Sequence, residues 1–156
     1  LDTDNCGDVI AYEDLISNIF YDFTVSAVSV GDYKESANWK GRSANSMIFI
    51  HGPKPVTDKI ADVYKANYDE DNDVYAINCN AQLADFHLTI GKNVYTVKGK
   101  DMILQLAPNF CVLSIAPASF EDGDNDWILG LPFIRAYCHV FDVGLRRIGF
   151  APPKAS

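Results

Sequence analysis

No hydrophobic run in this sequence is long enough to span a membrane. Hydrophobic residues make up 48% of the 156-residue chain, yet none of their runs approaches the ~18 residues that a spanning helix requires. The opening residues, Leu1–Asp4, contain neither a basic segment nor an apolar core. We therefore expect no membrane insertion, and we expect that any signal peptide has already been removed from this chain.

Basic residues are scarce relative to acidic ones. Thirteen Lys and Arg against twenty-one Asp and Glu give a net charge of −8. Such a surface repels phosphate backbones, which argues against nucleic acid as a partner. A chain of this length can bury roughly 68–70% of its unfolded surface, so we expect residues 1–156 to form a single domain.

Metal-binding cysteine motifs are absent. The four cysteines, Cys6, Cys79, Cys111 and Cys138, include no C-x-x-C pair, and only Cys138 has a neighbouring histidine. This spacing argues against a zinc site. Four widely spread cysteines instead predict two long-range disulfides in an oxidising compartment, and the spacing leaves all three pairings open. Four reduced thiols in a cytosolic protein are the alternative.

Short alternating segments indicate a mostly β domain. Phe23–Val30 alternates apolar with small residues, and Asp85–Ile90 leads through Gly91-Lys92-Asn93 into Val94–Val97 as a hairpin. Further extended segments are expected at Ser46–Ile50, Val74–Cys79, Met102–Leu106, Cys111–Ala116, Trp127–Leu129, His139–Asp142 and Arg147–Ala151. Helices are expected only at Pro55–Ala66 and Leu131–Tyr137.

Two acidic segments could be taken for calcium loops. Neither Asp69–Asp73 nor Glu121–Asp126 has the spaced ligands and distal glutamate of an EF-hand. Both are interpreted as solvated turns. The aromatic residues fit core packing rather than a cofactor site, and no cofactor is expected.

A specific series of motifs closes the chain. Trp127–Gly130 is followed by Phe133–Tyr137, then by Val140–Asp142 and Arg147–Pro152. This series resembles the closing segment of pepsin-like aspartic proteases, which have two similar lobes. In that family, two apolar residues and a glycine run beneath the active site and support the catalytic loop.

The resemblance assigns roles to particular residues and extends to the start of the chain. It implies that Ile128, Leu129 and Gly130 form the supporting strand. Gly7–Tyr12 resembles the strand that follows the junction between the two lobes, and Leu1–Gly7 is especially similar to nematode members. The fold implied is the C-terminal lobe of a pepsin-like protease, a β-barrel or sandwich with one or two short helices.

The catalytic loop of this lobe is the point of departure from the family. Each lobe contributes an Asp-Thr/Ser-Gly loop, and the two carboxylates share a proton while activating water. Residues 39–53 align without a gap with the family pattern W-x-x-x-x-D-T-G-T-S-x-x-x-G-P. Ala44 then takes the place of the catalytic Asp, Asn45 of the Thr, Ser46 of the Gly and Met47 of the second Thr.

Four consecutive replacements favour natural degeneration over a single engineered change. The second Thr normally hydrogen-bonds to the partner lobe, which Met47 cannot do, and Ser46 lacks the backbone freedom of glycine. The resemblance therefore implies no catalytic residue in this chain.

Substitutes for the lost acid are not evident in the sequence. Asp32, Glu35 and Asp58 are expected in surface turns or on the first helix. Ser43 and Ser46 lie near His51 but lack a nucleophile-elbow motif and an orienting Asp.

The family resemblance also implies a disulfide pairing. Cys79 and Cys111 match the standard pair of this lobe, and Cys6 and Cys138 then pair as in nematode members. A 30-residue loop closed in this way stabilises a fold by about 3–4 kcal/mol.

Two functions remain open from the sequence. The first is a secreted, proteolytically inactive protein that binds a host or self protein or peptide through the retained lobe surface. The alternative is a C-terminal-lobe fragment of a two-lobed homologue that pairs with an N-terminal lobe. Association of two copies is a third, structural arrangement.

The former face between the lobes discriminates between them. It should be polar in an isolated protein and apolar in a fragment. Lys40 and Arg42, beside the degenerate loop, favour the polar alternative.

Overall fold

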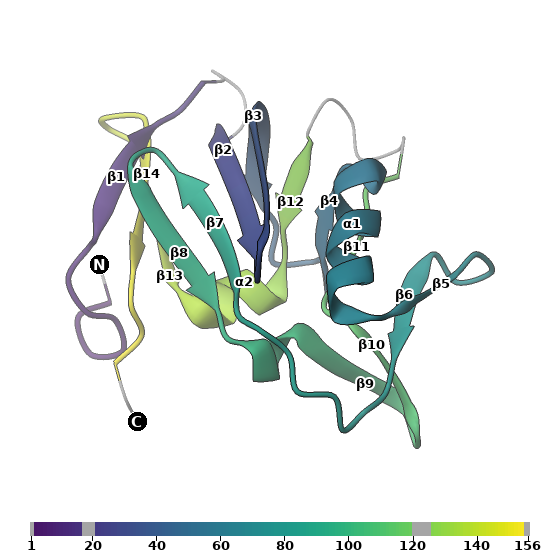
Figure 1. The fold of residues 1–156 in the computed structure, drawn as a ribbon. Helices are drawn as coiled ribbons and strands as arrows, with labels where there is room; N and C mark the ends of the chain where they lie inside the picture. Colours follow the sequence, from purple (N-terminus) through teal and green to yellow (C-terminus); the bar gives the residue numbers. More distant parts are fainter. Residues whose placement is uncertain (1, 17–20, 120–125, 155–156) are drawn as a thin grey trace.

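A computed structural model describes residues 2–16, 21–119 and 126–154. Within these ranges the chain is built mainly from strands in three sheets, with two α-helices and one 3-10 turn (Figure 1). The strands are β1 (Ala11–Asp14), β2 (Asp22–Val30), β3 (Tyr33–Ser43), β4 (Ile50–Gly52), β5 (Asn67–Asp69), β6 (Val74–Ile77), β7 (Phe86–Ile90), β8 (Asn93–Val97), β9 (Ile103–Ala107), β10 (Phe110–Leu113), β11 (Ile115–Pro117), β12 (Trp127–Leu129), β13 (Cys138–Asp142) and β14 (Arg147–Ala151). The mostly β fold class predicted from the sequence is confirmed.

The largest sheet has seven strands in the order β11-β4-β12-β3-β2-β7-β8. Its middle is the long β2–β3 hairpin, which turns at Gly31, where φ is +56°. A glycine adopts this left-handed conformation without steric cost. The sheet therefore offers the broad platform on which the other elements pack.

Strand β12 enters this sheet between β3 and β4, although it comes more than seventy residues later in the chain. It runs parallel to β3 and antiparallel to β4. The chain connecting β3 to β4, residues 44–49, must therefore pass over the end of β12. This crossing brings the predicted loop and the predicted supporting strand together.

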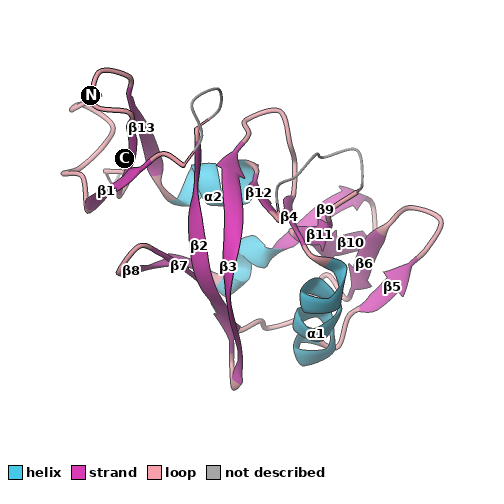
Figure 2. Cartoon of the chain, turned by 90° about the horizontal axis from the view of Figure 1, so that it is seen from above, coloured by secondary structure: helices cyan, strands magenta, loops and turns pink. Residues whose placement is uncertain are grey.

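Smaller sheets lie at the two ends of the molecule. The three-stranded sheet β1-β14-β13 lies at one end and the four-stranded sheet β5-β6-β10-β9 at the other, as seen from above in Figure 2. Figure 1 shows the N- and C-terminal segments beside the three-stranded sheet. Helix α1 (Lys54–Tyr64) packs near β11, and α2 (Leu131–Ala136) follows β12 directly.

One continuous core joins the large sheet to the helices. Its largest fully buried side chains come from all three sheets, both helices and the 3-10 turn: Trp127, Tyr75, Tyr95, Phe23, Phe86, Phe133, Phe150, Ile50, Ile60, Leu88, Ile90 and Met102. The ring of Trp127 packs edge-on against Trp39 of β3, with 5.7 Å between ring centroids. It also fills the space beside Gly52, where an added Cβ would lie 2.4 Å from the indole ring. Strand β12 is thus fixed by packing on both sides.

Most sequence-based element predictions are confirmed, with three corrections. Ser46–Ile50 is not a strand: residues 45–49 form turns and bends, and only Ile50 begins β4. Cys111–Ala116 is divided into two strands, because the chain bends at Ser114. Strand β10 belongs to the four-stranded sheet and β11 to the seven-stranded sheet. Val74–Cys79 ends as a strand at Ile77.

Strands β1, β3 and β5 were not among the extended segments predicted from alternation. Strand β3 reads Tyr-Lys-Glu-Ser-Ala-Asn-Trp-Lys-Gly-Arg-Ser, with polar residues on both faces for most of its length. Its pairing with β2 rather than its own pattern therefore determines its conformation. No helix among the described residues is long and apolar enough to cross a membrane.

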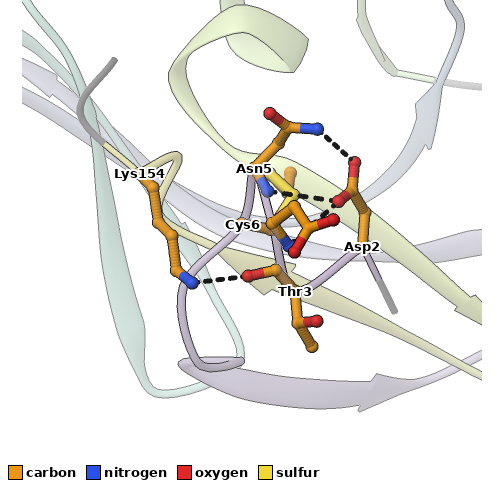
Figure 3. Close-up of a disulfide and its surroundings, with 7 residues drawn as sticks. Asp2, Thr3, Asn5, Cys6 and Lys154 are labelled. Carbon is orange, nitrogen blue, oxygen red and sulfur yellow. Dashed lines mark hydrogen bonds between the residues drawn. A yellow bond between two sulfur atoms is a disulfide. The ribbon is translucent and has the colours of Figure 1, made fainter.

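Both disulfides implied by the family resemblance are present. Cys79–Cys111 ties the chain after β6 to β10, and Cys6–Cys138 ties the N-terminal segment to the start of β13 (Figure 3). Around Cys6, the Asp2 carboxylate accepts hydrogen bonds from Asn5, and the Lys154 ammonium donates one to the Thr3 carbonyl. The two chain ends are therefore held together by both covalent and polar contacts.

Gly130, between β12 and α2, gives a direct test of the crossing. A Cβ at Gly130 would lie 2.1 Å from the Phe49 carbonyl oxygen and 2.5 Å from that of Met47. Because both contacts are with backbone, Gly130→Ala should lower the free energy of unfolding by about 3 kcal/mol or more.

The matched control is Gly144→Ala, whose added Cβ would find its nearest neighbour at 3.8 Å. In urea titrations of both variants, Gly144→Ala should change the free energy of unfolding by no more than about 0.5 kcal/mol. Equal effects of the two substitutions would contradict the crossing described here.

Candidate functional site: the loop between β3 and β4

The loop between β3 and β4, residues 44–49, is held against β12 by backbone hydrogen bonds. The amide of Ala44 donates to the carbonyl of Leu129 (3.1 Å), and the amide of Leu131 donates to the carbonyl of Met47 (2.8 Å). The Met47 amide closes the turn onto the Ala44 carbonyl at 3.3 Å. The loop thus keeps a defined backbone path. The methyl group of Ala44 lies in it, at the position where the family pattern has the catalytic aspartate.

Side chains within the loop differ in exposure. Asn45, Ser46 and Ile48 are exposed, whereas Ala44 and Met47 are half-buried. In the described part of the chain, no hydrogen bond or ion pair joins residues 44–47 to a carboxylate. The loop itself therefore offers no acid for activating water.

The acids considered as substitutes lie in other contacts. Asp32 is in the exposed β2–β3 turn, as expected. Glu35 lies within β3 rather than in a turn, and its carboxylate accepts a hydrogen bond from Tyr33. Asp58, on α1, binds the ammonium of Lys54 at 2.9 Å and accepts a hydrogen bond from Tyr75. The carboxylates of Glu35 and Asp58 thus have partners outside the loop, and Asp32 lies in a turn at the far end of the β2–β3 hairpin.

An ion pair stands just before the loop. The Arg42 Nε lies 2.8 Å from the Asp22 carboxylate, whose side chain is 3% exposed. Strand pairing aligns Arg42 with Ile128 of β12 and Ile128 with His51 of β4. Residues paired across strands lie on the same face. Asp22, Arg42, Ile128 and His51 therefore form one row across the face of the sheet.

The neighbouring residue of β3 points to the opposite, core-facing side. Ser43 is aligned with the fully buried Leu129, and its hydroxyl lies 2.6 Å from the Nδ1 of His139 on β13. His139 packs edge-on against Phe133 and Phe150, with ring centroids 5.3 and 5.0 Å away. The end of β3, immediately before the loop, is thus connected to the three-stranded sheet by a Ser–His hydrogen bond.

Burial depresses the basicity of this histidine. Desolvation lowers the pKa of His139 from its ordinary 6.5 to about 4, because the apolar surroundings disfavour the imidazolium. Its Nε2 is buried without a hydrogen-bond partner among the described residues. At neutral pH, the neutral ring serves as a packing element and a partner for Ser43.

The Ser43–His139 pair and the Asp22–Arg42 pair were missed from the sequence. Ser43 was considered only with His51, which instead lies 3.1 Å, through Nδ1, from the Pro117 carbonyl oxygen. Partners 96 and 20 residues apart carry no spacing signal. Only the pairing of β3 with β2 and the position of β13 bring these residues together.

The described residues contain no group of three or more His, Cys, Asp or Glu side chains suited to a metal ion. Asp69 of the first acidic segment accepts hydrogen bonds from Asp71 and Asn72, the arrangement of a turn. Of the second acidic segment, residues 121–125 lie outside the described residues.

Comparison with known proteins identifies relatives along the whole chain. The family model described as eukaryotic aspartyl protease matches residues 1–153. Aspartic protease 6 of Caenorhabditis elegans is 37% identical over 152 residues, which cover 97% of this chain and 39% of that protein. Aspartic protease 2 of Necator americanus is 30% identical over 154 residues, 99% of this chain and 36% of that protein. The chain therefore spans less than half the length of these relatives.

A vertebrate relative matches a shorter region. Pregnancy-associated glycoprotein 4 of Ovis aries is 34% identical over 107 residues, which cover 67% of this chain and 27% of that protein.

The half-buried His139, whose Nε2 is fully buried, predicts a specific dependence of stability on pH. Because the pKa of His139 is lower in the folded chain than in the unfolded one, unfolding takes up a proton between pH 6.5 and pH 4. The contribution of the neutral His139 to the free energy of unfolding is fully present above pH 6.5 and is lost as the pH falls towards 4. The loss amounts to about 3 kcal/mol. His139→Gln should remove this part of the pH dependence in urea titrations at pH 4 and pH 7.

The control is His87→Gln, which removes another half-buried histidine, hydrogen-bonded to Thr96 at 2.8 Å on the β7–β8 hairpin. This variant should retain the difference in stability between pH 4 and pH 7. An unaltered difference in His139→Gln would show that His139 is not buried as described.

Proposed function

This chain belongs to the eukaryotic aspartyl protease family, and from that membership we propose that it is the non-catalytic C-terminal lobe of a two-lobed protein. In this proposal the lobe pairs with an N-terminal lobe but supplies no carboxylate to the shared acid pair. The carrying observation is the apolar surface exposed on the three-stranded sheet β1-β14-β13.

Large apolar side chains gather on this sheet and on the turns at its ends. They are Ile10 (47% exposed), Tyr12 (37%), Ile16 (55%), Phe141 (48%), Val143 (71%) and Leu145 (65%). The β13–β14 turn lies beside the segment after β1, because the Leu15 amide donates to the Arg146 carbonyl. The strand register places Tyr12 and Phe141 on opposite faces of the sheet, so the apolar side chains gather mainly at the β13–β14 turn and the segment after β1. Exposed apolar side chains gathered in this way are typical of an interface. This arrangement supports the fragment alternative over an isolated lobe with a polar face.

The edge of this sheet offers further bonding capacity. Strand β1 pairs with β14 on one side and has no strand on its other side among the described residues. An unpaired edge accepts an additional strand through main-chain hydrogen bonds. A second lobe that extends this sheet would cover both the free edge and the apolar residues.

Loss of catalysis is proposed from the alignment of Ala44 with the catalytic aspartate. An aspartic protease needs two carboxylates, one to activate water and one to protonate the substrate carbonyl. A single aspartate from the other lobe would lack its partner. Neither the row Asp22–Arg42–Ile128–His51 nor the Ser43–His139 pair restores such an acid pair, since Asp22 is bound to Arg42 and Ser43 faces the core.

Secretion is proposed from the two disulfides. Disulfides persist in oxidising compartments and are rare in the cytosol. The net charge of −8 suits an extracellular fluid. A protein or peptide ligand, from the host or from the same organism, would bind between the two lobes without being cleaved.

Pairing can be tested with the N-terminal lobe of Aspartic protease 6 as partner, expressed separately. The double variant Val143→Glu/Leu145→Glu should weaken the complex at least tenfold, because two charges would be buried at the interface. Dissociation constants from analytical ultracentrifugation are the measurement.

The matched control is Val94→Glu, a residue 61% exposed on β8 of the seven-stranded sheet. It should leave the dissociation constant unchanged. Absence of any complex with the unaltered chain, or equal weakening by both variants, would count against pairing through the three-stranded sheet.

Catalytic loss can be tested in a single-chain fusion of that N-terminal lobe to this chain. The fusion should not cleave denatured haemoglobin at any pH from 3 to 7. The quadruple variant Ala44→Asp/Asn45→Thr/Ser46→Gly/Met47→Thr rebuilds the family loop and should introduce pepstatin-sensitive cleavage at acidic pH. Cleavage by the unaltered fusion would refute the non-catalytic assignment.

A further inference from the structure

A cavity of about 390 Å³ opens beside the degenerate loop. The apolar part of its wall comes from the loop, β9 and the first turn of α2: Ile48, Ile103, Leu104, Leu106, Leu131 and Pro132. The volume lies at the lower end of the range for small-molecule sites, roughly 300–1,000 Å³. The space suits a compact ligand with substantial apolar surface.

Two of these wall residues leave much of their aliphatic side chains exposed to water. Ile48 is 50% exposed and Leu106 is 44% exposed. Covering them with hydrocarbon would remove apolar area from water, worth about fourfold in affinity per buried methylene. The cavity therefore has the means to bind an aliphatic chain.

The charges at the cavity have a net positive sign in a chain whose overall charge is −8. The Lys100 ammonium lies 3.8 Å from the Asp101 carboxylate, so their two charges largely cancel. Arg135 remains: it is exposed in the last turn of α2, and within the described ranges no carboxylate lies within ion-pair distance of it. The hydroxyl of Ser114 is already used, donating to the Asp101 carbonyl at 2.8 Å.

We propose that this cavity binds an amphipathic carboxylic acid of medium chain length. The hydrocarbon lies along Ile48, Leu106 and Leu131, and the carboxylate pairs with the guanidinium of Arg135. Arginine is suited to this role because its planar fork binds a carboxylate through two parallel hydrogen bonds. The site does not depend on pairing with another lobe, and it involves no residue of the proposed interface on β1-β14-β13.

The test is binding of a homologous series to the 156-residue chain at pH 7 by isothermal titration calorimetry. Octanoate, decanoate and dodecanoate are compared with the alcohols of the same lengths. Affinity should rise about fourfold per added methylene in both series, up to the length that fills the cavity. The acids should bind at least tenfold more tightly than the alcohols.

Variants separate the two contributions. Arg135→Gln should weaken the acids at least tenfold and leave the alcohols unchanged, whereas Ile48→Glu should abolish binding of both. Leu106→Glu provides a second variant of the wall should Ile48→Glu fail to fold, as judged from its urea midpoint. The matched controls are Lys98→Gln, a cation 67% exposed outside the cavity lining, and Val94→Glu.

Three results would overturn the proposal. They are no saturable binding, affinity independent of chain length, or equal loss with Arg135→Gln and Lys98→Gln.

Discussion

The passage of β12 between β3 and β4 is the constraint on which the rest of the molecule depends. This strand joins the loop 44–49 to the core because its Leu129 carbonyl accepts a hydrogen bond from the Ala44 amide, and the Leu131 amide just beyond it donates to the Met47 carbonyl. Gly130 must lack a side chain because two carbonyl oxygens of the loop occupy the space where a Cβ would lie. The backbone that positions a catalytic group is thus retained by packing requirements that do not involve the catalytic group itself.

This separation is consistent with the proposed loss of catalytic side chains from an otherwise ordered lobe. The residues that fix the crossing, such as Trp127 and Leu129, are fully buried and contribute to the central core. Asn45 and Ser46 are exposed, so their replacement costs little stability. Catalytic side chains in such a loop can therefore be lost while the scaffold stays intact. Outside this scaffold, exposed apolar side chains gather at the cavity beside the loop and on the three-stranded sheet at the end of the lobe.

The sequence predicted the fold class, the two helices and the disulfide pairs well, because these follow from periodicity and from motifs of the family. The sequence-based prediction failed where tertiary contacts determine the local conformation or bring distant side chains together. Residues 46–49 alternate too weakly to distinguish a strand from the turn that crosses β12, and β3 carries polar residues on both faces. The pairs Ser43–His139 and Asp22–Arg42 join segments whose proximity only the completed sheets create. The cavity was equally invisible, since its walls come from four separate parts of the chain.

The edge-on contact between Trp39 and Trp127 has an optical consequence. These are the only two tryptophans in the chain, one on β3 and one on β12, and their rings lie 5.7 Å apart. Two indoles this close couple their electronic transitions, so the circular dichroism of the lobe contains a contribution from this contact between β3 and β12. The two tryptophans therefore report, without any added label, whether β12 is packed against β3.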